Sequence, residues 1–123
     1  MISQLGQIAM TVADLEGAVA FYRDVLQVPF LFQFPGLAFF NCGGVRLMLT
    51  RPEGSETPSG NSVLYFKVTD IHEEARGLES RGVKLEGEPH LIAKLPDHEL
   101  WMAFFRDPER NLLALMSEVR PAT

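Results

Sequence analysis

The sequence predicts an α+β domain of two βαβββ modules, whose curved mixed sheets surround a cavity and carry helices on the outer face. Two observations lead to this fold class. Each half of the chain reads as a strand, a helix and further strands, and the two halves align so that Ile8 falls on Leu64 and Asp14 on Asp70. Repetition of the element order is strong evidence because each copy must bury its apolar residues in the same way.

The first module is expected at about residues 1–51. Residues 7–12 alternate between apolar and smaller or more polar side chains, which is the period of a half-buried strand. Asp14 can cap a helix over about 15–26, where apolar residues recur at helical spacing. Turn signals separate the remaining strands, which are predicted over 30–34, 37–41 and 45–50, with turns at Pro35-Gly36 and Gly43-Gly44.

The second module is expected at about 63–118, after a loop over 52–62 that is rich in proline, glycine and serine. Asp70 caps its helix, Glu73 completes a capping-box pattern, and Gly82 can end the helix. The strands of this module are predicted over 63–68, 83–85, 90–95, 100–106 and 112–117. A tail over 119–123 completes a single domain of residues 1–123.

Composition narrows the function classes. A formal net charge of −5 without a basic run argues against a nucleic-acid partner. No apolar stretch approaches the roughly 20 residues that span a bilayer, and no signal peptide is visible, so no membrane association is expected. Cys42 is the single cysteine and cannot form an internal disulfide. It is expected to be a small buried residue in a cytoplasmic protein.

Two motifs resemble the vicinal oxygen chelate superfamily, which includes glyoxalases, bleomycin resistance proteins and dioxygenases. Residues 12–22 carry the strand-Asp-Leu-Glu-x-Ala-Val-x-Phe-Tyr opening, and residues 105–112 resemble the family's Asp-Pro-x-Gly-Asn hairpin. Arg110 stands where the family usually has glycine, which should strain that turn slightly. The resemblance covers essentially the whole chain and implies the two-module fold around a small-molecule cavity.

The same resemblance implies a divalent metal held by four side chains, one from the first and one from the last strand of each module. In this sequence the four positions are Gln7, Met48, Val63 and Ala114. Only Gln7 offers a donor suited to a hard or borderline cation, and Met48 offers a soft thioether. We therefore expect no metal and no other cofactor at the usual place.

Strand alternation predicts which side chains line the cavity. The residues opposite the helix-facing positions are expected to bind a small apolar or aromatic ligand: Gln7, Arg46, Met48, Tyr65, Lys67, Trp101 and Ala114. The small side chains of Val63 and Ala114 are expected to leave room near the centre. Arg46 or Lys67 would pair with an anionic group of the ligand, unless they simply extend into water.

Aromatic residues are expected to form the cavity walls. The candidates for the walls are Phe32, Phe39, Trp101 and Phe105. Phe30, Phe32 and Phe34 are expected to share one face of their strand.

The histidines provide a second candidate site. His98 is the candidate catalytic residue, as a metal-free general base at the cavity mouth, although a plain loop position is the simpler interpretation of its surroundings. His90, His98 and Glu99 have spacing compatible with an alternative metal site. His72 is expected to be a solvated residue of the second helix.

Three functions are compatible with these residues. The first is a metal-free protein that binds a small molecule. The second is a lyase, isomerase or dioxygenase of the same superfamily, with an unusual metal site or a metal-free base. The third is a regulatory or interaction domain with a vestigial cavity. Fold resemblance cannot choose among them, because one scaffold carries many chemistries. A homodimer is expected from the resemblance and from the strand edges that a two-module chain must cover.

Overall fold

The computed structural model describes residues 1–52 and 60–121. Internal contacts divide the chain into two units, Met1–Ser62 and Val63–Thr123, and each contains one four-stranded sheet. The boundary falls where the sequence predicts the second module to begin. Most of the predicted loop over 52–62, and the end of the predicted tail, lie outside the described residues.

Unit 1 is a βαβββ module. Asp14 accepts a hydrogen bond from the Gly17 backbone N–H (3.1 Å) and caps the helix, as predicted. The sheet has the order β1-β4-β3-β2, and β1 runs parallel to β4. The elements are β1 (Gln7–Thr11), α1 (Leu15–Ala20), which continues as the π-helix η1 (Phe21–Val25), β2 (Phe30–Phe34), β3 (Leu37–Cys42) and β4 (Val45–Thr50).

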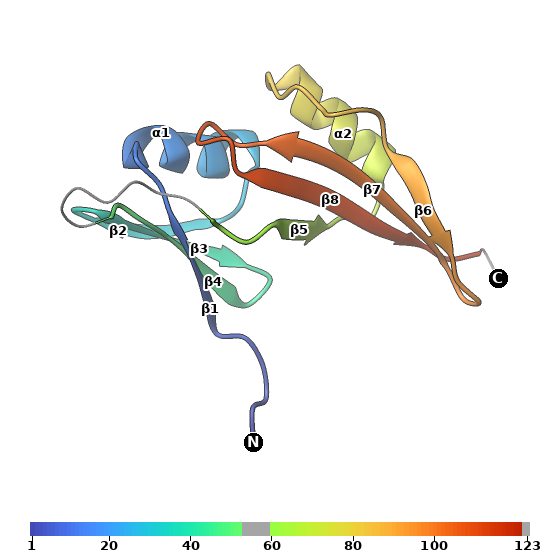
Figure 1. Cartoon of the computed structure of the whole chain (residues 1–123), viewed down its shortest axis with the longest axis horizontal. Coiled ribbons are helices and arrows are strands. Elements are labelled where there is room, and N and C mark those ends of the chain that lie inside the picture. The colour runs from blue at the N-terminus through green and yellow to red at the C-terminus, as the bar shows by residue number, and fades with distance from the viewer. Residues whose placement is uncertain (53–59, 122–123) are drawn as a thin grey trace. The chain divides into compact units, whose positions relative to one another are not determined.

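Unit 2 repeats this topology. Its sheet has the order β5-β8-β7-β6, β5 runs parallel to β8, and α2 lies along one face of the sheet (Figure 1). The elements are β5 (Leu64–Lys67), α2 (Ile71–Ser80), β6 (His90–Lys94), β7 (Glu99–Arg106) and β8 (Leu112–Val119). The prediction of an α+β fold with two modules is confirmed. No helix in the described part of the chain is long and apolar enough to cross a membrane.

The predicted strand over 83–85 is wrong. After α2 the chain forms a helix stop in which the Val83 N–H donates to the Leu78 carbonyl (3.0 Å) and Gly82 adopts a positive φ of 94°. Val83 is buried against this helix end and does not join the sheet. Its apolar character therefore reflects helix capping, which a short apolar run cannot distinguish from a strand.

Each unit buries the sheet face that carries its helix. In unit 1 the ring of Tyr22 is fully buried, packs against Phe40 (6.1 Å between centroids), and its hydroxyl donates to the Met10 sulfur (3.9 Å). In unit 2 the corresponding buried residues are Phe105 and Leu113 on the sheet. Because one face of each sheet is used for this core, the opposite face is available for other contacts.

The turn between β7 and β8 contains strained backbone. Arg110 has a positive φ of 69°, in the left-handed region that favours glycine. The strain predicted for Arg110 is therefore present in the structure. The Arg110 carbonyl accepts a hydrogen bond from Arg106 (3.2 Å), an interaction that a glycine would keep because it uses only the backbone of residue 110.

Replacing Arg110 by glycine is expected to raise the free energy of unfolding by about 0.5–1 kcal/mol. Relief of the left-handed strain outweighs the extra flexibility of glycine in the unfolded chain. Urea denaturation measures this change. Arg110→Ala is the control, because it removes the guanidinium but keeps the Cβ atom. Equal stabilisation by both variants would show that charge, and not backbone strain, is responsible.

Candidate functional site

The sheet face of unit 1 that points away from the helix is here called open face 1. Met10, Leu47 and Leu49 are buried on the helix side, and the residues that alternate with them lie on the other side. The residues of β1 and β4 on open face 1 are Gln7, Ala9, Thr11, Arg46, Met48 and Thr50. This assignment matches the faces that the sequence predicts for these two strands.

Three phenylalanines gather on open face 1. Phe39 lies opposite Met48 in the β3–β4 register, and Phe32 lies opposite Phe39 in the β2–β3 register. The Phe39 ring centroid lies 4.8 Å from that of Phe32 and 6.5 Å from that of Phe34. Phe32 and Phe34 are 41% and 56% exposed, which is unusual for rings of this size. They extend an aromatic surface beside Met48.

The prediction that Phe30 shares this face with Phe32 and Phe34 is wrong. The register shifts between Phe30 and Phe32, as in a β-bulge, and Phe30 lies opposite Phe40. Its ring contacts Phe40 (5.5 Å), which in turn contacts Tyr22 on the helix side. The irregularity adds one residue to β2, so the simple alternation fails at this point.

Arg46 brings a positive charge to the aromatic surface. Its guanidinium carbon lies 5.7 Å from the centroid of the Phe39 ring, within the range of a cation–π interaction. Within residues 1–52 and 60–121, no carboxylate forms an ion pair with Arg46.

The four positions of the family's metal site do not fit a divalent cation. Gln7 Nε2 lies 3.9 Å from the Met48 sulfur, so these two positions do lie together on open face 1. The side chains of Val63 and Ala114 carry no donor atom. One amide and one soft thioether cannot provide three or four ligands for zinc, nickel, iron or manganese.

The corresponding face of unit 2 is here called open face 2, and Ala114 lies at its centre. Ala114 pairs with Tyr65 on one side and with Phe104 on the other. The rings of Tyr65 and Phe104 come from the two strands that flank β8, yet their centroids are only 6.2 Å apart. The two rings therefore lean toward each other over Ala114, which is 0% exposed.

The expectation that the small side chain of Ala114 leaves room at the centre is wrong. Phe104 lies directly opposite Ala114, which has no exposed surface, while Tyr65 remains 48% exposed. The predicted placement of Tyr65 on the face away from the helix agrees with its exposure. Phe104 was not predicted as a site residue, although it alternates with the helix-facing Phe105 and so had to lie on this face.

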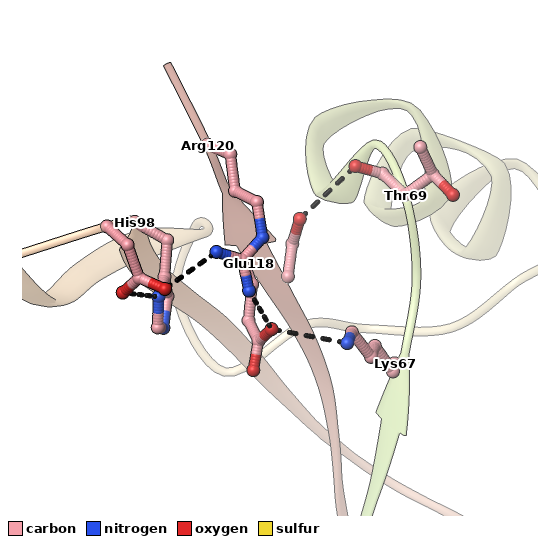
Figure 2. Close-up of polar contacts among 7 residues, drawn as sticks. Lys67, Thr69, His98, Glu118 and Arg120 are labelled. Carbon is pink, nitrogen blue, oxygen red and sulfur yellow. Dashed lines mark hydrogen bonds and ion pairs between the residues drawn. The ribbon is translucent and has the colours of Figure 1, made fainter. Parts of the chain in front are cut away.

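Lys67 lies on open face 2, but its charge is engaged. Its ammonium group pairs with Glu118 (3.2 Å), and Arg120 reaches the same carboxylate oxygen (3.4 Å), as Figure 2 shows. The hydrogen bond from Lys67 lowers the pKa of Glu118. Lys67 is therefore less suited than Arg46 to bind an anionic ligand.

His98 lies in the turn between β6 and β7, at the end of the same network. Its Nδ1 is 2.8 Å from Asp97, which also pairs with Arg120 (2.8 Å) (Figure 2). Hydrogen bonds from Arg120 and then from His98 lower the pKa of Asp97 to about 2. Asp97 is thus ionised at neutral pH and can only accept, so Nδ1 carries the proton and Nε2 of the neutral ring is a potential base.

His98 lines a pocket of about 400 Å³, together with the other residues of 94–99 and 119–121. The His98 side chain is 14% exposed, so it is largely enclosed yet reachable. The pocket lies at the turn end of the β6–β7 hairpin, and the catalytic role of His98 stays a prediction.

The predicted cavity positions of Trp101 and Phe105 are wrong. Trp101 pairs with the buried Ser117 of β8, and its ring contacts His72 of α2 (5.4 Å between centroids). Phe105 is 0% exposed on this same helix-facing side. Both residues alternate with Phe104, which places them under α2 and away from open face 2.

His90, His98 and Glu99 do not form the alternative metal site. His90 pairs with Met102 and Glu99 pairs with Lys94, so they lie at opposite ends of the β6–β7 hairpin. The carboxylate of Glu99 accepts a hydrogen bond from the Trp101 indole (3.2 Å). Among the residues that the structure describes, no three His, Cys, Asp or Glu side chains are grouped to hold a metal.

Cys42 lies at the end of β3 and is partly buried. Burial raises the pKa of its thiol, which disfavours the nucleophilic thiolate. This environment agrees with the interpretation of Cys42 as a small structural residue.

Comparison with known proteins identifies the superfamily. The model of the Glyoxalase/Bleomycin resistance protein/Dioxygenase superfamily matches residues 4–115. The uncharacterized protein YraH of Bacillus subtilis (strain 168) is 32% identical over 129 residues, which cover 91% of this chain and 96% of that protein.

Solved structures agree with this assignment. A lactoylglutathione lyase from Agrobacterium tumefaciens is similar with a TM-score of 0.75 and 27% identity over 94% of each chain. A virulence protein from Salmonella typhimurium has a TM-score of 0.79 and 21% identity, covering 97% of this chain and 99% of its own. The family-model match over residues 4–115 and the 32% identity to YraH, together with the repeated βαβββ topology and the two sequence motifs, show that the chain belongs to the glyoxalase/bleomycin resistance protein/dioxygenase superfamily.

Proposed function

We propose that this protein binds a small molecule with an apolar or aromatic body and one anionic group, and that it does so without the divalent metal of its enzymatic relatives. The site is open face 1, with Arg46 as the anchor for the anion. The observation that carries the proposal is the Arg46 guanidinium, which lies over Phe39 without a carboxylate partner in the described part of the chain.

The surroundings of Arg46 support an aromatic ligand. Phe32 and Phe34 expose ring surface beside Phe39, where a flat molecule can stack. Gln7 and Met48 add one amide and one polarisable sulfur beside them. A charge-assisted hydrogen bond to Arg46 would contribute about 1.5–3 kcal/mol in a partly dry site. Ligand-binding roles for Tyr65, Lys67 and Ala114 in unit 2 stay predictions.

A matched ligand pair tests the proposal. Benzoate and other aromatic carboxylates are expected to raise the melting temperature more than their neutral amides, because only the carboxylates can pair with Arg46. Arg46→Gln should lower the affinity for the carboxylates by about tenfold or more and remove this preference. Arg46→Lys keeps a positive charge and should retain part of the preference for carboxylates over amides.

Two outcomes would contradict the proposal. One is carboxylate binding that is unchanged in Arg46→Gln. The other is stoichiometric zinc, nickel, manganese or iron in the purified protein, measured by elemental analysis. If no compound of the panel shifts the melting temperature, an interaction domain with a vestigial cavity becomes the better explanation.

An enzymatic function is the second candidate. The His98–Asp97 pair in its 400 Å³ pocket supports it, because an oriented neutral imidazole can remove a proton from a carbon acid. The similarity to a lactoylglutathione lyase is compatible with this chemistry. Deuterium exchange at a carbon–hydrogen bond of a compound in the ligand panel, catalysed by the wild-type protein and lost in His98→Gln, would favour the enzyme over the binding protein.

We also propose a homodimer in the cytoplasm. The edge strand β6 exposes Leu91 and Ile92, and Leu95 follows it, an apolar edge that a second copy would cover. Sedimentation at micromolar concentration is expected to give twice the chain mass of 13.8 kDa, and a monomeric mass would refute the dimer.

The proposed location in the cytoplasm is supported by the cysteine content. The single cysteine, which cannot pair within the chain, is compatible with a reducing compartment.

A further inference from the structure

A histidine and two methionines form a row across three adjacent strands of unit 2. His90 of β6 lies directly opposite Met102 of β7, and Met102 lies directly opposite Met116 of β8. Directly opposite residues of antiparallel strands point to the same face. That face is open face 2, because the His90 ring contacts Phe104 at 6.4 Å between centroids.

The backbone orients the His90 ring. Its Nδ1 lies 3.2 Å from the Glu88 carbonyl oxygen, which can only accept a hydrogen bond. The Nδ1 atom therefore carries the proton, and Nε2 of the neutral ring keeps its lone pair. A hydrogen bond of this kind on the far nitrogen is the usual way in which proteins orient a metal-binding histidine.

All three side chains can be reached from solvent. His90 is exposed, and Met102 and Met116 are partly exposed, although methionine is usually a core residue. The neighbouring Lys67 pairs with Met116 in the β5–β8 register, but its charge is balanced by Glu118 at 3.2 Å. The row thus combines two thioethers and one imidazole beside an aromatic ring.

We propose that His90, Met102 and Met116 bind a soft monovalent metal ion, copper(I). Thioether sulfur selects copper(I) over hard divalent ions, and imidazole is compatible with it. Met102 is the central ligand, with Met116 and His90 on the two neighbouring strands. The Phe104 ring beside His90 can add a cation–π contact to the bound ion.

This site is separate from the proposed ligand site. It uses residues of unit 2 alone, whereas the small-molecule proposal depends on Arg46 and Phe39 of unit 1. It also differs from the four positions of the family's divalent metal, since none of Gln7, Met48, Val63 and Ala114 takes part. Either proposal can therefore fail without the other.

Competition with a chromogenic copper(I) chelator, bicinchoninate, under anaerobic conditions tests the site. The experiment uses the full chain with Cys42→Ser, because the free thiol is itself a soft ligand. We expect one copper(I) per chain. Met102→Leu combined with Met116→Leu should lower the affinity by at least about tenfold, as should His90→Asn, because losing a ligand costs at least as much as losing its outer-shell support.

Met48→Leu is the matched control. It removes a partly exposed methionine from open face 1 and should leave the copper(I) affinity unchanged. Methionine-to-leucine changes nearly conserve volume and should keep the fold, which melting curves verify. Failure of the Cys42→Ser protein to take copper(I) from the chelator would overturn the proposal. Equal affinity in the Met102/Met116 double variant and the control would also overturn it.

Discussion

Replacing Asp107 by alanine is expected to lower the free energy of unfolding by about 3 kcal/mol. Asp107 is only 4% exposed, and its carboxylate organises the β7–β8 turn. It accepts hydrogen bonds from the Glu109 N–H (2.9 Å), the Asn111 N–H (2.8 Å) and the Asn111 side-chain amide (2.9 Å). Truncation leaves these donors without their charged acceptor. Hydrogen bonds to an ionised carboxylate are stronger than those between neutral groups, so their loss is costly.

Chemical denaturation measures this loss, and two variants calibrate it. Asp107→Asn keeps one acceptor oxygen and should recover part of the stability. Asp24→Ala removes an exposed aspartate whose ion pair with Arg23 lies at the surface, and should change stability by less than about 0.5 kcal/mol. A loss in Asp107→Ala no larger than in Asp24→Ala would contradict the role assigned to this turn.

The turn matters for the proposed copper(I) site because it sets the register between β7 and β8. That register places Phe104 opposite Ala114 and Met102 opposite Met116. A slip by one residue would move each of these side chains to the helix side of the sheet. Asp107 therefore supports open face 2 through the register of these two strands.

The sequence predicted the parts of the site that follow from regular alternation. Gln7, Arg46 and Met48 lie on the expected face, because β1 and β4 are regular and their partners Met10 and Leu47 are strongly apolar. The capping residues Asp14 and Asp70 were equally predictable, since each caps its helix through its own side chain.

Irregular strands and long-range pairs were not predictable. Register shifts in β2 and β6 decide where Phe30 and His90 lie, and no residue pattern marks them. The partner of Lys67 is Glu118, far along the chain, so the ion pair between them depends on the β5–β8 register. The placement of Met102 opposite Met116 also depends on the strand register, so the sequence alone could not predict it.

The role of Asn61 is another feature that the sequence could not predict. Its side-chain oxygen accepts from the Thr11 N–H (3.1 Å), and its amide donates to the Thr11 carbonyl (2.9 Å), so it pairs with the edge strand β1 as a neighbouring strand would. Its loop composition predicts only a turn or linker. The structural role of this asparagine depends on β1, a strand far from it in the sequence.

Ala114→Phe is expected to destabilise the protein by about 2–3 kcal/mol, because overpacking a filled site forces neighbouring side chains out of their rotamers. The sequence alone suggested that this alanine leaves empty space, in which an added ring would cost less. The structure shows instead that Ala114 is fully buried and that the Tyr65 and Phe104 rings lie 6.2 Å apart across its strand.

Ala9→Phe is the matched control for this substitution. Ala9 lies on open face 1, opposite Met48 of β4, but unlike Ala114 it is exposed, so the added ring meets solvent and should cost less than about 0.5 kcal/mol. Combining Ala114→Phe with Phe104→Ala should then cost at least about 1 kcal/mol less than the sum of the single changes, because the second change vacates the space that the first requires. Additive costs, or an Ala114→Phe protein as stable as Ala9→Phe, would show that the two rings do not cover Ala114 and that the centre of open face 2 is free for a ligand.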